Sequence, residues 1–222
     1  MPIKIIYEDN SIIIVQKDAG LATQSANPAQ PDCVSLIKEH LRKSDPGITK
    51  EPYLGIVHRL DQPVAGILVF AKGRRSAAEL SRQAGDGIMN KHYLAAVSGI
   101  VDCPEETLLT DSMYKDPKCS RAVITDSRDG EHKVREAKLL YRTEKILPDR
   151  NITILSISLI TGRFHQIRAQ LAHMGHPIIG DRKYGSDVPY TKGIALAADR
   201  LEFIHPLSGA KVEKSVDFSF DL

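Results

Sequence analysis

The sequence has no tryptophan, only three cysteines and no long apolar run. Cys33, Cys103 and Cys119 form no CxxC pair, so neither a disulfide framework nor a zinc ribbon is indicated. The apolar runs are far shorter than the roughly 20 residues that a membrane span needs, and the N-terminus has no apolar leader segment. We therefore expect a cytoplasmic protein with no membrane partner.

Neither sign of charge is in excess. Thirty Lys and Arg against 28 Asp and Glu leave a formal net charge of +2 on 222 residues, which neither requires nor excludes a polyanionic partner. A nucleic-acid site must then be a local patch. The length and the hydrophobic content of 42% are typical of one globular domain. We predict a single domain over residues 1–222, and a monomer.

Alternating and β-branched runs predict strands at 3–8, 11–17, 55–60, 66–72, 91–99, 134–146, 151–160, 194–204 and 211–218. Helical spacing predicts helices at 34–41, 76–83 and 164–174. The polar stretch 103–133, broken by prolines and Asp129-Gly130, indicates an elaborated hairpin or an insertion. Strands that cluster in hairpins with helices between them favour the α+β class, with a mixed, mostly antiparallel sheet and flanking helices.

Two segments carry residues suited to chemistry. In the first, His58, Arg59 and Asp61 stand at the end of a predicted strand, and Pro63 places Asp61 on a loop because proline cannot donate to a sheet ladder. Taken alone, this segment fits a turn-capping aspartate equally well. The second segment runs from Thr161 to Asp181.

In the second segment, Gly162 permits a tight turn from strand to helix. Arg163, His165 and Gln166 then fall near a helix N-terminus, which is a natural anion site. Arg168 lies further along this helix and would project inward if its apolar neighbours face the core. It could then pair with a buried carboxylate.

The two segments together resemble the RluA-type pseudouridine synthase family, which carries an HRLD strand and loop and, later, GRxHQIR followed by GHPIxGD. Here these are His58-Arg59-Leu60-Asp61, Gly162–Arg168 and Gly175–Asp181. Residues 91–99 are similar to the family's KxYxAxVxG strand, and 7–9 with 17–20 to its opening hairpin. The resemblance covers nearly the whole chain, but not the S4-type RNA-binding domain that precedes it in many relatives.

The resemblance implies a pseudouridine-synthase-like fold and conversion of uridine to pseudouridine in a transfer or ribosomal RNA stem-loop. It assigns Asp61 as the catalytic carboxylate, Arg168 as its cationic partner and Tyr93 as the wall that faces uracil. An ionised aspartate in a closed pocket needs such a partner, because desolvation favours the neutral acid. Arg59 is the matched candidate to fill the gap left by the flipped uridine. The reaction needs no cofactor and no metal, since no atoms enter or leave.

The chain departs from the family pattern at three places. Val64-Ala65 replaces a Thr-Ser pair after the HRLD motif, Asp18 replaces a proline, and Ala197 replaces a common histidine. None of these changes touches Asp61. The loss of two hydroxyls beside the loop predicts a different positioning of the substrate.

Several residues have a second interpretation. His58 is either an RNA contact or a core histidine that orients the loop, and His165 and Gln166 either contact phosphate or cap the helix. His173 and His176 are expected to pack a turn rather than bind metal, since no third ligand stands near them in the sequence. The basic residues 72, 74 and 75 fit an RNA backbone or a solvated helix start.

Two other functions compete with the isomerase. One is an RNA-binding or chaperone-like module that keeps the fold without needing catalysis. The other is a hydrolase of N-glycosidic bonds, which would release free uracil. The polar stretch 103–133 is where we expect target selection to reside, because it is loop-rich and flanked by core strands.

Overall fold

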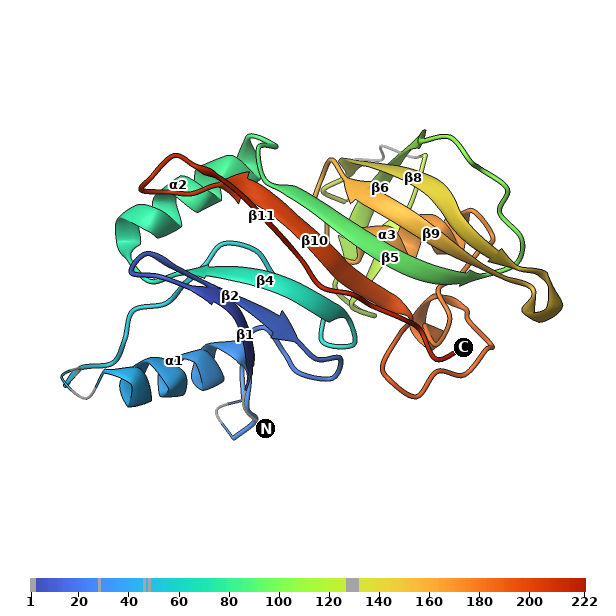
Figure 1. Ribbon diagram of the computed structural model, residues 1–222. Helices are drawn as coiled ribbons and strands as arrows, with labels where there is room; N and C mark the ends of the chain where they lie inside the picture. The colour runs from blue at the N-terminus through green and yellow to red at the C-terminus, as the bar shows by residue number, and fades with distance from the viewer. Residues whose placement is uncertain (1–2, 28, 46, 48, 127–131) are drawn as a thin grey trace. The chain divides into compact units, whose positions relative to one another are not determined.

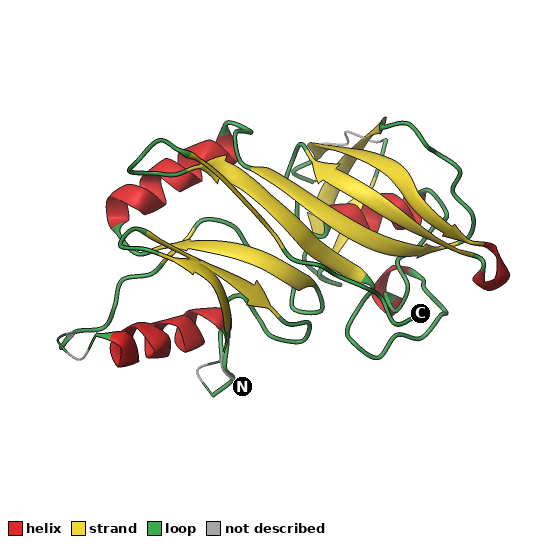
Figure 2. Cartoon of the chain, viewed as in Figure 1, coloured by secondary structure: helices red, strands yellow, loops and turns green. Residues whose placement is uncertain are grey.

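The computed structural model describes residues 3–27, 29–45, 47, 49–126 and 132–222, and strands dominate it (Figure 2). They form two compact units, Met1–Lys91 with Ala198–Asp217 and His92–Ala197 with Phe218–Leu222. The chain crosses between the units within strand β5 (Asn90–Ser98) and again within β10 (Leu196–Ile204). This division does not test whether the units fold together, so the one-domain assignment stays a prediction.

The first unit contains the N-terminal hairpin that the sequence predicts. Strands β1 (Lys4–Glu8) and β2 (Ile12–Lys17) pair antiparallel, and β2 pairs antiparallel with β4 (Ala65–Ala71) from Ile12↔Ala71 to Lys17↔Gly66. β10 lies next to β4, β11 (Lys211–Ser215) pairs with β10, and the short β3 (Gly55–Ile56) pairs with β4. Nearly all of the side chains of β2 and β4 are buried, which explains their uninterrupted apolar runs.

Two helices flank these strands (Figure 1). α1 (Cys33–Ser44) starts after Asp32, whose carboxylate accepts from Ser35 N–H at 2.7 Å while the Ser35 hydroxyl accepts from Asp32 N–H at 3.0 Å. This reciprocal pair satisfies donors that a helix start leaves open. α2 (Arg74–Gly85) opens with two exposed arginines and buries Leu80 and Gln83.

The second unit is built on long antiparallel strands. Its order is β5, β9 (Ile152–Leu159), β8 (Arg135–Leu147), β6 (Thr107–Asp116) and β7 (Arg121–Ile124), with a short 3-10 turn, η1 (Pro148–Arg150), between β8 and β9. Residues 103–133 thus supply a β6–β7 hairpin whose first strand also pairs with β8. The Asp129-Gly130 turn signal lies outside the described residues.

Helix α3 (Gln166–His173) packs in the second unit against the β6–β7 hairpin. A second short 3-10 turn, η2 (Arg182–Tyr184), follows it. A small apolar core joins these parts and consists of Met113, Ala122, Ala137, Ala169 and Tyr184, with Phe164 packed against it. α3 and the hairpin therefore form one packed body.

The predicted fold class is confirmed: among the described residues a mostly antiparallel set of strands is accompanied by three α-helices. Several boundaries differ from the prediction, and two of these differences lie beside the predicted site residues. The strand expected at 55–60 ends at Ile56, and the helix expected from 164 begins at Gln166 because His165 has a φ of 52°, which is left-handed.

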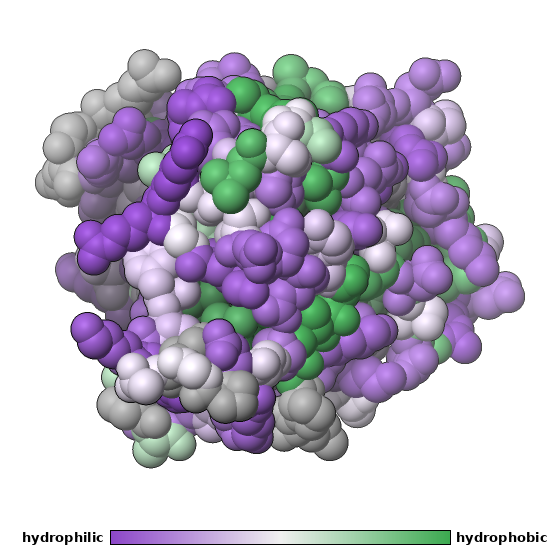
Figure 3. Space-filling model, turned by 60° about the vertical axis from the view of Figure 1, so that its left-hand side comes forward, coloured by the Kyte–Doolittle hydropathy of each residue, from purple (hydrophilic) through white to green (hydrophobic). Residues whose placement is uncertain are grey.

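Hydrophilic residues cover most of the face drawn in Figure 3, and hydrophobic residues occupy smaller patches of it. In the described part of the chain, every helix is too short or too polar to cross a membrane.

Candidate active site

Asp61 lies in the first unit, on the loop that joins β3 to β4. Its backbone carbonyl accepts a hydrogen bond from Val64 N–H at 3.0 Å, which closes a turn over Gln62 and Pro63. The Asp61 side chain is partly exposed. The loop position predicted for Asp61 is confirmed.

The segment after β2 holds this loop on both sides of Asp61. The hydroxyl of Thr23 donates to the Leu60 carbonyl at 2.9 Å and accepts from Leu60 N–H at 3.1 Å. Gly20 N–H donates to the Gln62 carbonyl at 2.8 Å, and the Gln62 side chain donates back to the Gly20 carbonyl at 2.9 Å. Because Thr23 is only 3% exposed, its two bonds satisfy backbone groups that water reaches poorly.

Lys17 is a fully buried cation at the base of this loop. Its ammonium donates to three carbonyl oxygens, those of Asp18, Leu21 and Gln62, at 3.0, 2.6 and 3.1 Å. Burial lowers the pKa of Lys17 to about 8, against the opposing attraction of Cys33, Asp61 and Asp18. The site thus contains a positive charge close to Asp61 that is only just retained at neutral pH.

His58 makes a hydrogen bond to the backbone of the first unit. Its Nε2 accepts a hydrogen bond from Val69 N–H of β4 at 3.1 Å, and burial, followed by the charge of Lys91, lowers its pKa to about 3. A neutral ring that accepts from a strand backbone fits the loop-orienting role considered for His58. Its contact with RNA stays a prediction. Arg59 beside it is exposed.

Arg168 lies in the second unit and is 5% exposed. Its Nε and Nη2 donate to the two carboxylate oxygens of Asp181 at 2.7 and 2.9 Å, and its guanidinium carbon lies 5.0 Å from the centre of the Tyr184 ring. The inward projection expected for Arg168 is confirmed, and a buried carboxylate does bind it. A guanidinium has five N–H donors, so one arginine can serve two carboxylates.

Tyr93, the third predicted catalytic residue, is in the second unit on β5 and is 6% exposed. Asp61 therefore belongs to one unit and Tyr93 and Arg168 to the other. The arrangement of the three around a uracil stays a prediction.

The turn before α3 carries the predicted phosphate contacts. Gln166 is buried, and its side-chain oxygen accepts from Arg163 N–H at 3.0 Å and from the Thr161 hydroxyl at 2.8 Å. These bonds cap the turn, as one of the two interpretations of Gln166 expected. Arg163 is exposed, and His165 stacks on Phe164 with ring centres 3.8 Å apart. RNA contact by Arg163, His165 and Gln166 stays a prediction.

Of the two histidines expected to pack a turn, His176 fits that role and the exposed His173 does not. Nδ1 of His176 lies 2.8 Å from the Ser98 carbonyl, and a Cβ at Gly99 would come within 2.8 Å of the same nitrogen. His173 is exposed at the end of α3. The residues that the structure describes contain no group of three potential metal ligands.

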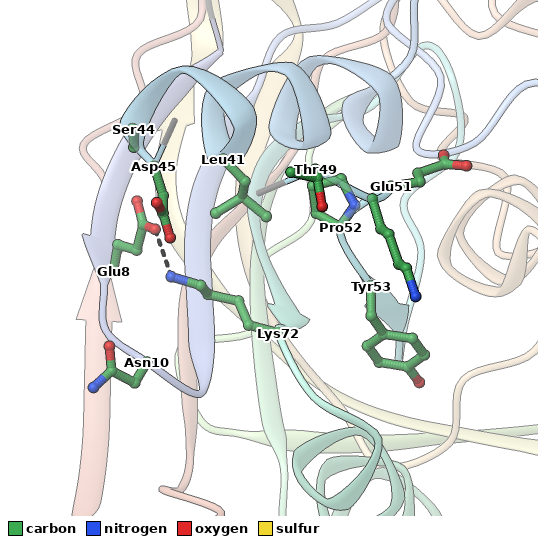
Figure 4. Close-up of a pocket in the computed structure, with 11 residues that line it drawn as sticks. Glu8, Asn10, Leu41, Ser44, Asp45, Thr49, Glu51, Pro52, Tyr53 and Lys72 are labelled. Carbon is green, nitrogen blue, oxygen red and sulfur yellow. Dashed lines mark hydrogen bonds and ion pairs between the residues drawn. The ribbon is translucent and has the colours of Figure 1, made fainter. Parts of the chain in front are cut away.

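The first unit also has a surface pocket of about 480 Å³, beside the C-terminal end of α1 (Figure 4). Glu8 faces Lys72 across it at 2.7 Å and also lies 2.7 Å from His40 Nε2. Although burial raises the pKa of Glu8, the bonds from Lys72 and His40 outweigh it and the pKa falls below its ordinary value. The pairing of Lys72 with Glu8 favours a structural role for this lysine. Asp61 is not among the residues that line the pocket.

Comparison with known proteins places these features in a family. A model described as RNA pseudouridylate synthase matches residues 11–173, which is well over half of the chain. The chain belongs to the RNA pseudouridylate synthase family. It is therefore an isomerase of the class that converts uridine in RNA to pseudouridine.

Curated relatives of this synthase are about one-third identical to it. It is 30% identical to ribosomal large subunit pseudouridine synthase D of Xanthomonas campestris pv. campestris, over 100% of this chain and 68% of the relative. It is 34% identical to ribosomal large subunit pseudouridine synthase D of Nitrosomonas europaea, over 94% of this chain and 60% of the relative. The chain thus spans about two-thirds of the length of these relatives.

Solved structures support the fold of the synthase. The structure of human RNA pseudouridylate synthase domain containing 1 matches with a TM-score of 0.75 at 20% identity, covering 97% of this chain and 83% of that one. The structure of human RNA pseudouridylate synthase domain containing 4 matches with a TM-score of 0.74 at 18% identity, covering 97% of this chain and 88% of that one. These likenesses concern the fold alone.

Several residues that organise the two units of the synthase were not predicted from the sequence. Asp181 and Tyr184, which bind and cover Arg168, and Thr23, which fixes Leu60, were not singled out. A signal was present for Lys17, since a lysine that ends the apolar run of β2 just before Gly20 is either solvated or buried for a purpose. No such signal was present for Thr23, because its hydrogen bonds to Leu60 form only when distant segments of the chain meet.

Proposed function

We propose that this synthase isomerises uridines in ribosomal RNA through the carboxylate of Asp61, with Arg168 as its cationic partner and Tyr93 against the uracil. The bond from uracil N1 to ribose C1′ breaks, the base turns, and C5 bonds to C1′, while C5 loses its proton to solvent and N1 takes one up. Atoms balance without a cofactor. The observation that carries the proposal is the family match over residues 11–173, which include Asp61, Tyr93 and Arg168.

The environment of Asp61 supports its role. The backbone on either side is fixed by Thr23, Gly20 and Gln62, so the carboxylate stands on a preorganised loop. Preorganised groups accelerate a reaction because little reorganisation is left for the moment of reaction. The buried ammonium of Lys17 adds a positive charge that attracts Asp61.

Arg168 is suited to be the partner of a reacting carboxylate because it is rigid. Asp181 binds two of its nitrogens in a fork-to-fork geometry, and this type of pairing fixes the plane of the guanidinium. An arginine held in this way can stabilise Asp61 without moving. We assign Asp181 as the residue that positions Arg168.

Arg59 and the turn before α3 supply contacts to RNA in this proposal. Arg59 is exposed two residues before Asp61, where its guanidinium can occupy the stack that the target uridine leaves. Arg163 is exposed in the turn before α3 and can neutralise a phosphate. His58, His165 and Gln166 remain weaker RNA contacts, since each of them has a bond within the protein.

Ribosomal RNA is the favoured substrate because the relatives from Xanthomonas and Nitrosomonas are named for the large ribosomal subunit. The β6–β7 hairpin in residues 103–133 is the proposed element of target selection. The test is to compare pseudouridine maps of ribosomal and transfer RNA from cells with and without the gene. Loss of one or more sites in large-subunit RNA is expected; loss confined to transfer RNA would correct the substrate, and identical maps would refute the proposal.

The two competing functions make different predictions in the same cells. A binding module would leave pseudouridine maps unchanged when Asp61→Ala replaces the wild type, whereas the proposed isomerase loses its sites. A glycosidic hydrolase would release free uracil from the RNA, whereas an isomerase releases none. Chromatography of the small-molecule products of a purified reaction separates these cases.

A further inference from the structure

Three exposed cations that have not been assigned a role meet in the second unit. Lys115 is the last residue but one of β6, Arg121 begins β7, and Lys183 lies on η2. The β6–β7 register pairs Lys115 with Ala122, next to Arg121, and Lys183 Nζ donates to the Ser120 carbonyl at 2.9 Å. The β6–β7 hairpin and η2, which is distant in the sequence, therefore present positive charge together at one end of the hairpin.

A row of aromatic rings lies beneath these cations. The ammonium of Lys115 lies 4.6 Å from the centre of the Phe164 ring, and Phe164 stacks on His165. His165 meets Tyr184 edge-on at 5.7 Å, and the guanidinium of Arg121 lies 5.0 Å from the Tyr184 ring. Contact with a ring limits the freedom of a long cationic side chain. Rings thus hold Lys115 and Arg121, and a hydrogen bond holds Lys183, so little side-chain entropy is left to lose when a ligand binds.

The row of rings packs against the small apolar core of the second unit. Tyr184 and Ala122 belong to this core, and the Tyr184 hydroxyl accepts from Ala122 N–H at 2.7 Å. The acid in the hairpin turn, Asp116, is used locally, because its carboxylate accepts from Lys118 N–H at 2.8 Å and from the thiol of Cys119 at 3.2 Å. Asp116 keeps its negative charge opposite Arg121 in the register, so three cations stand against one acid at this end of the hairpin.

We propose that Lys115, Arg121 and Lys183 form a basic row that binds the phosphate backbone of the substrate RNA. The inference rests on the proposed function, since it concerns the same RNA. Cations that are anchored on different groups suit a polyanion with one charge per nucleotide better than a small anion, which needs donors that converge on a point. The row carries affinity rather than sequence selection, because phosphate contacts hold no base information.

The test removes two of the cations and measures RNA binding as salt is varied. Lys115→Gln with Arg121→Gln is compared with Arg142→Gln and Lys145→Gln, which removes two exposed charges from β8 of the same unit. All proteins carry Asp61→Asn so that the RNA is not converted during the binding measurement. The probe is unmodified large-subunit ribosomal RNA transcribed in vitro, and the shortest fragment of it that the wild type modifies.

The basic-row variant should bind this RNA roughly tenfold more weakly. The slope of log Kd against log salt should fall by about 0.7 to 0.9 for each lost phosphate contact. The β8 variant should match the parent. With Asp61 intact, the β8 variant should keep the wild-type rate, whereas the basic-row variant should need roughly tenfold more RNA to reach half of its maximal rate. The charge-keeping variant Lys115→Arg with Arg121→Lys should restore binding, which separates lost charge from a disturbed hairpin.

Equal Kd values and slopes in the basic-row and β8 variants would overturn the inference, provided that the wild type modifies the transcript. A charge-keeping variant that binds as weakly as the glutamine variant would also overturn it. If the wild type forms no pseudouridine in any RNA, the proposed function fails first, and the two failures are therefore distinct.

Discussion

The buried pair between Arg168 and Asp181 allows a role in folding to be separated from a role in catalysis. Asp181→Asn keeps the shape of the side chain but removes the charge that faces the guanidinium, and both side chains are almost inaccessible, at 6% and 1% exposure. Removing one partner of a buried ion pair costs roughly 3–5 kcal/mol, because the other charge stays buried without compensation. The amide can still accept one hydrogen bond, so the lower end, about 3 kcal/mol, is expected.

A loss of this size lowers the midpoint of thermal unfolding by roughly 10 °C in a chain of this length. The chain has no tryptophan, so unfolding in urea or by heat is best followed by circular dichroism. The pair Arg168→Met with Asp181→Leu removes both charges, and replacing a buried ion pair by apolar side chains is often neutral. The double variant should therefore recover most of the stability that either single change loses.

Activity should not recover with it. In the proposed mechanism the guanidinium of Arg168 faces Asp61, so the folded double variant should form no pseudouridine. Two results would refute this reasoning. A double-mutant cycle with a coupling energy under about 0.5 kcal/mol, the usual deviation for independent sites, would show that the pair is not energetically linked. A stable double variant with full activity would remove Arg168 from the reaction.

Three further predictions concern the loop of Asp61. Between pH 8 and 10.5 the native state holds fewer protons on Lys17 than the unfolded state, so wild-type stability should rise there by roughly 3 kcal/mol relative to Lys17→Met. Activity should fall over the same pH range, because the neutral amine of Lys17 has two N–H donors for three carbonyls. If the activity instead rose with pH together with the stability measured in urea melts, this reasoning would be contradicted. Thr23→Val should lower the single-turnover rate tenfold or more with RNA affinity unchanged while Thr23→Ser stays active, and a fully active valine variant would exclude the clamp. Gly66→Ala should cost about 3 kcal/mol in a urea melt, since its φ is +138° and a Cβ would lie 2.5 Å from the Ala198 backbone; a loss under 0.5 kcal/mol would be contrary.

Most of the fold could be predicted from the sequence because hydrophobic periodicity is local. β2 and β4 are buried almost throughout, and their apolar runs are uninterrupted in the sequence. The strand expected to reach residue 60 stops at Ile56 for a reason that no pattern reveals. The His58 ring binds Val69 N–H and the Thr23 hydroxyl binds both backbone groups of Leu60, so side chains replace the ladder that a longer strand would form.

The candidate site was predictable only in part, and for a similar reason. Asp61 and Arg168 stand in motifs that the sequence displays directly. The residues that hold them come from elsewhere: Lys17 from β2 and Asp181 from the turn after α3. A hydrogen bond between distant segments leaves no periodic trace, and the burial that gives Lys17 a lowered pKa is a property of the packed unit rather than of the strand.

The central claim is that the carboxylate of Asp61 performs the isomerisation. It is tested most directly with an RNA transcript that carries tritium at C5 of uridine, because this hydrogen leaves to solvent when C5 becomes bonded to ribose. The account predicts rapid tritium release by the wild type and none above background by a folded Asp61→Asn protein that still binds the transcript. Release by Asp61→Asn at the wild-type rate would contradict it.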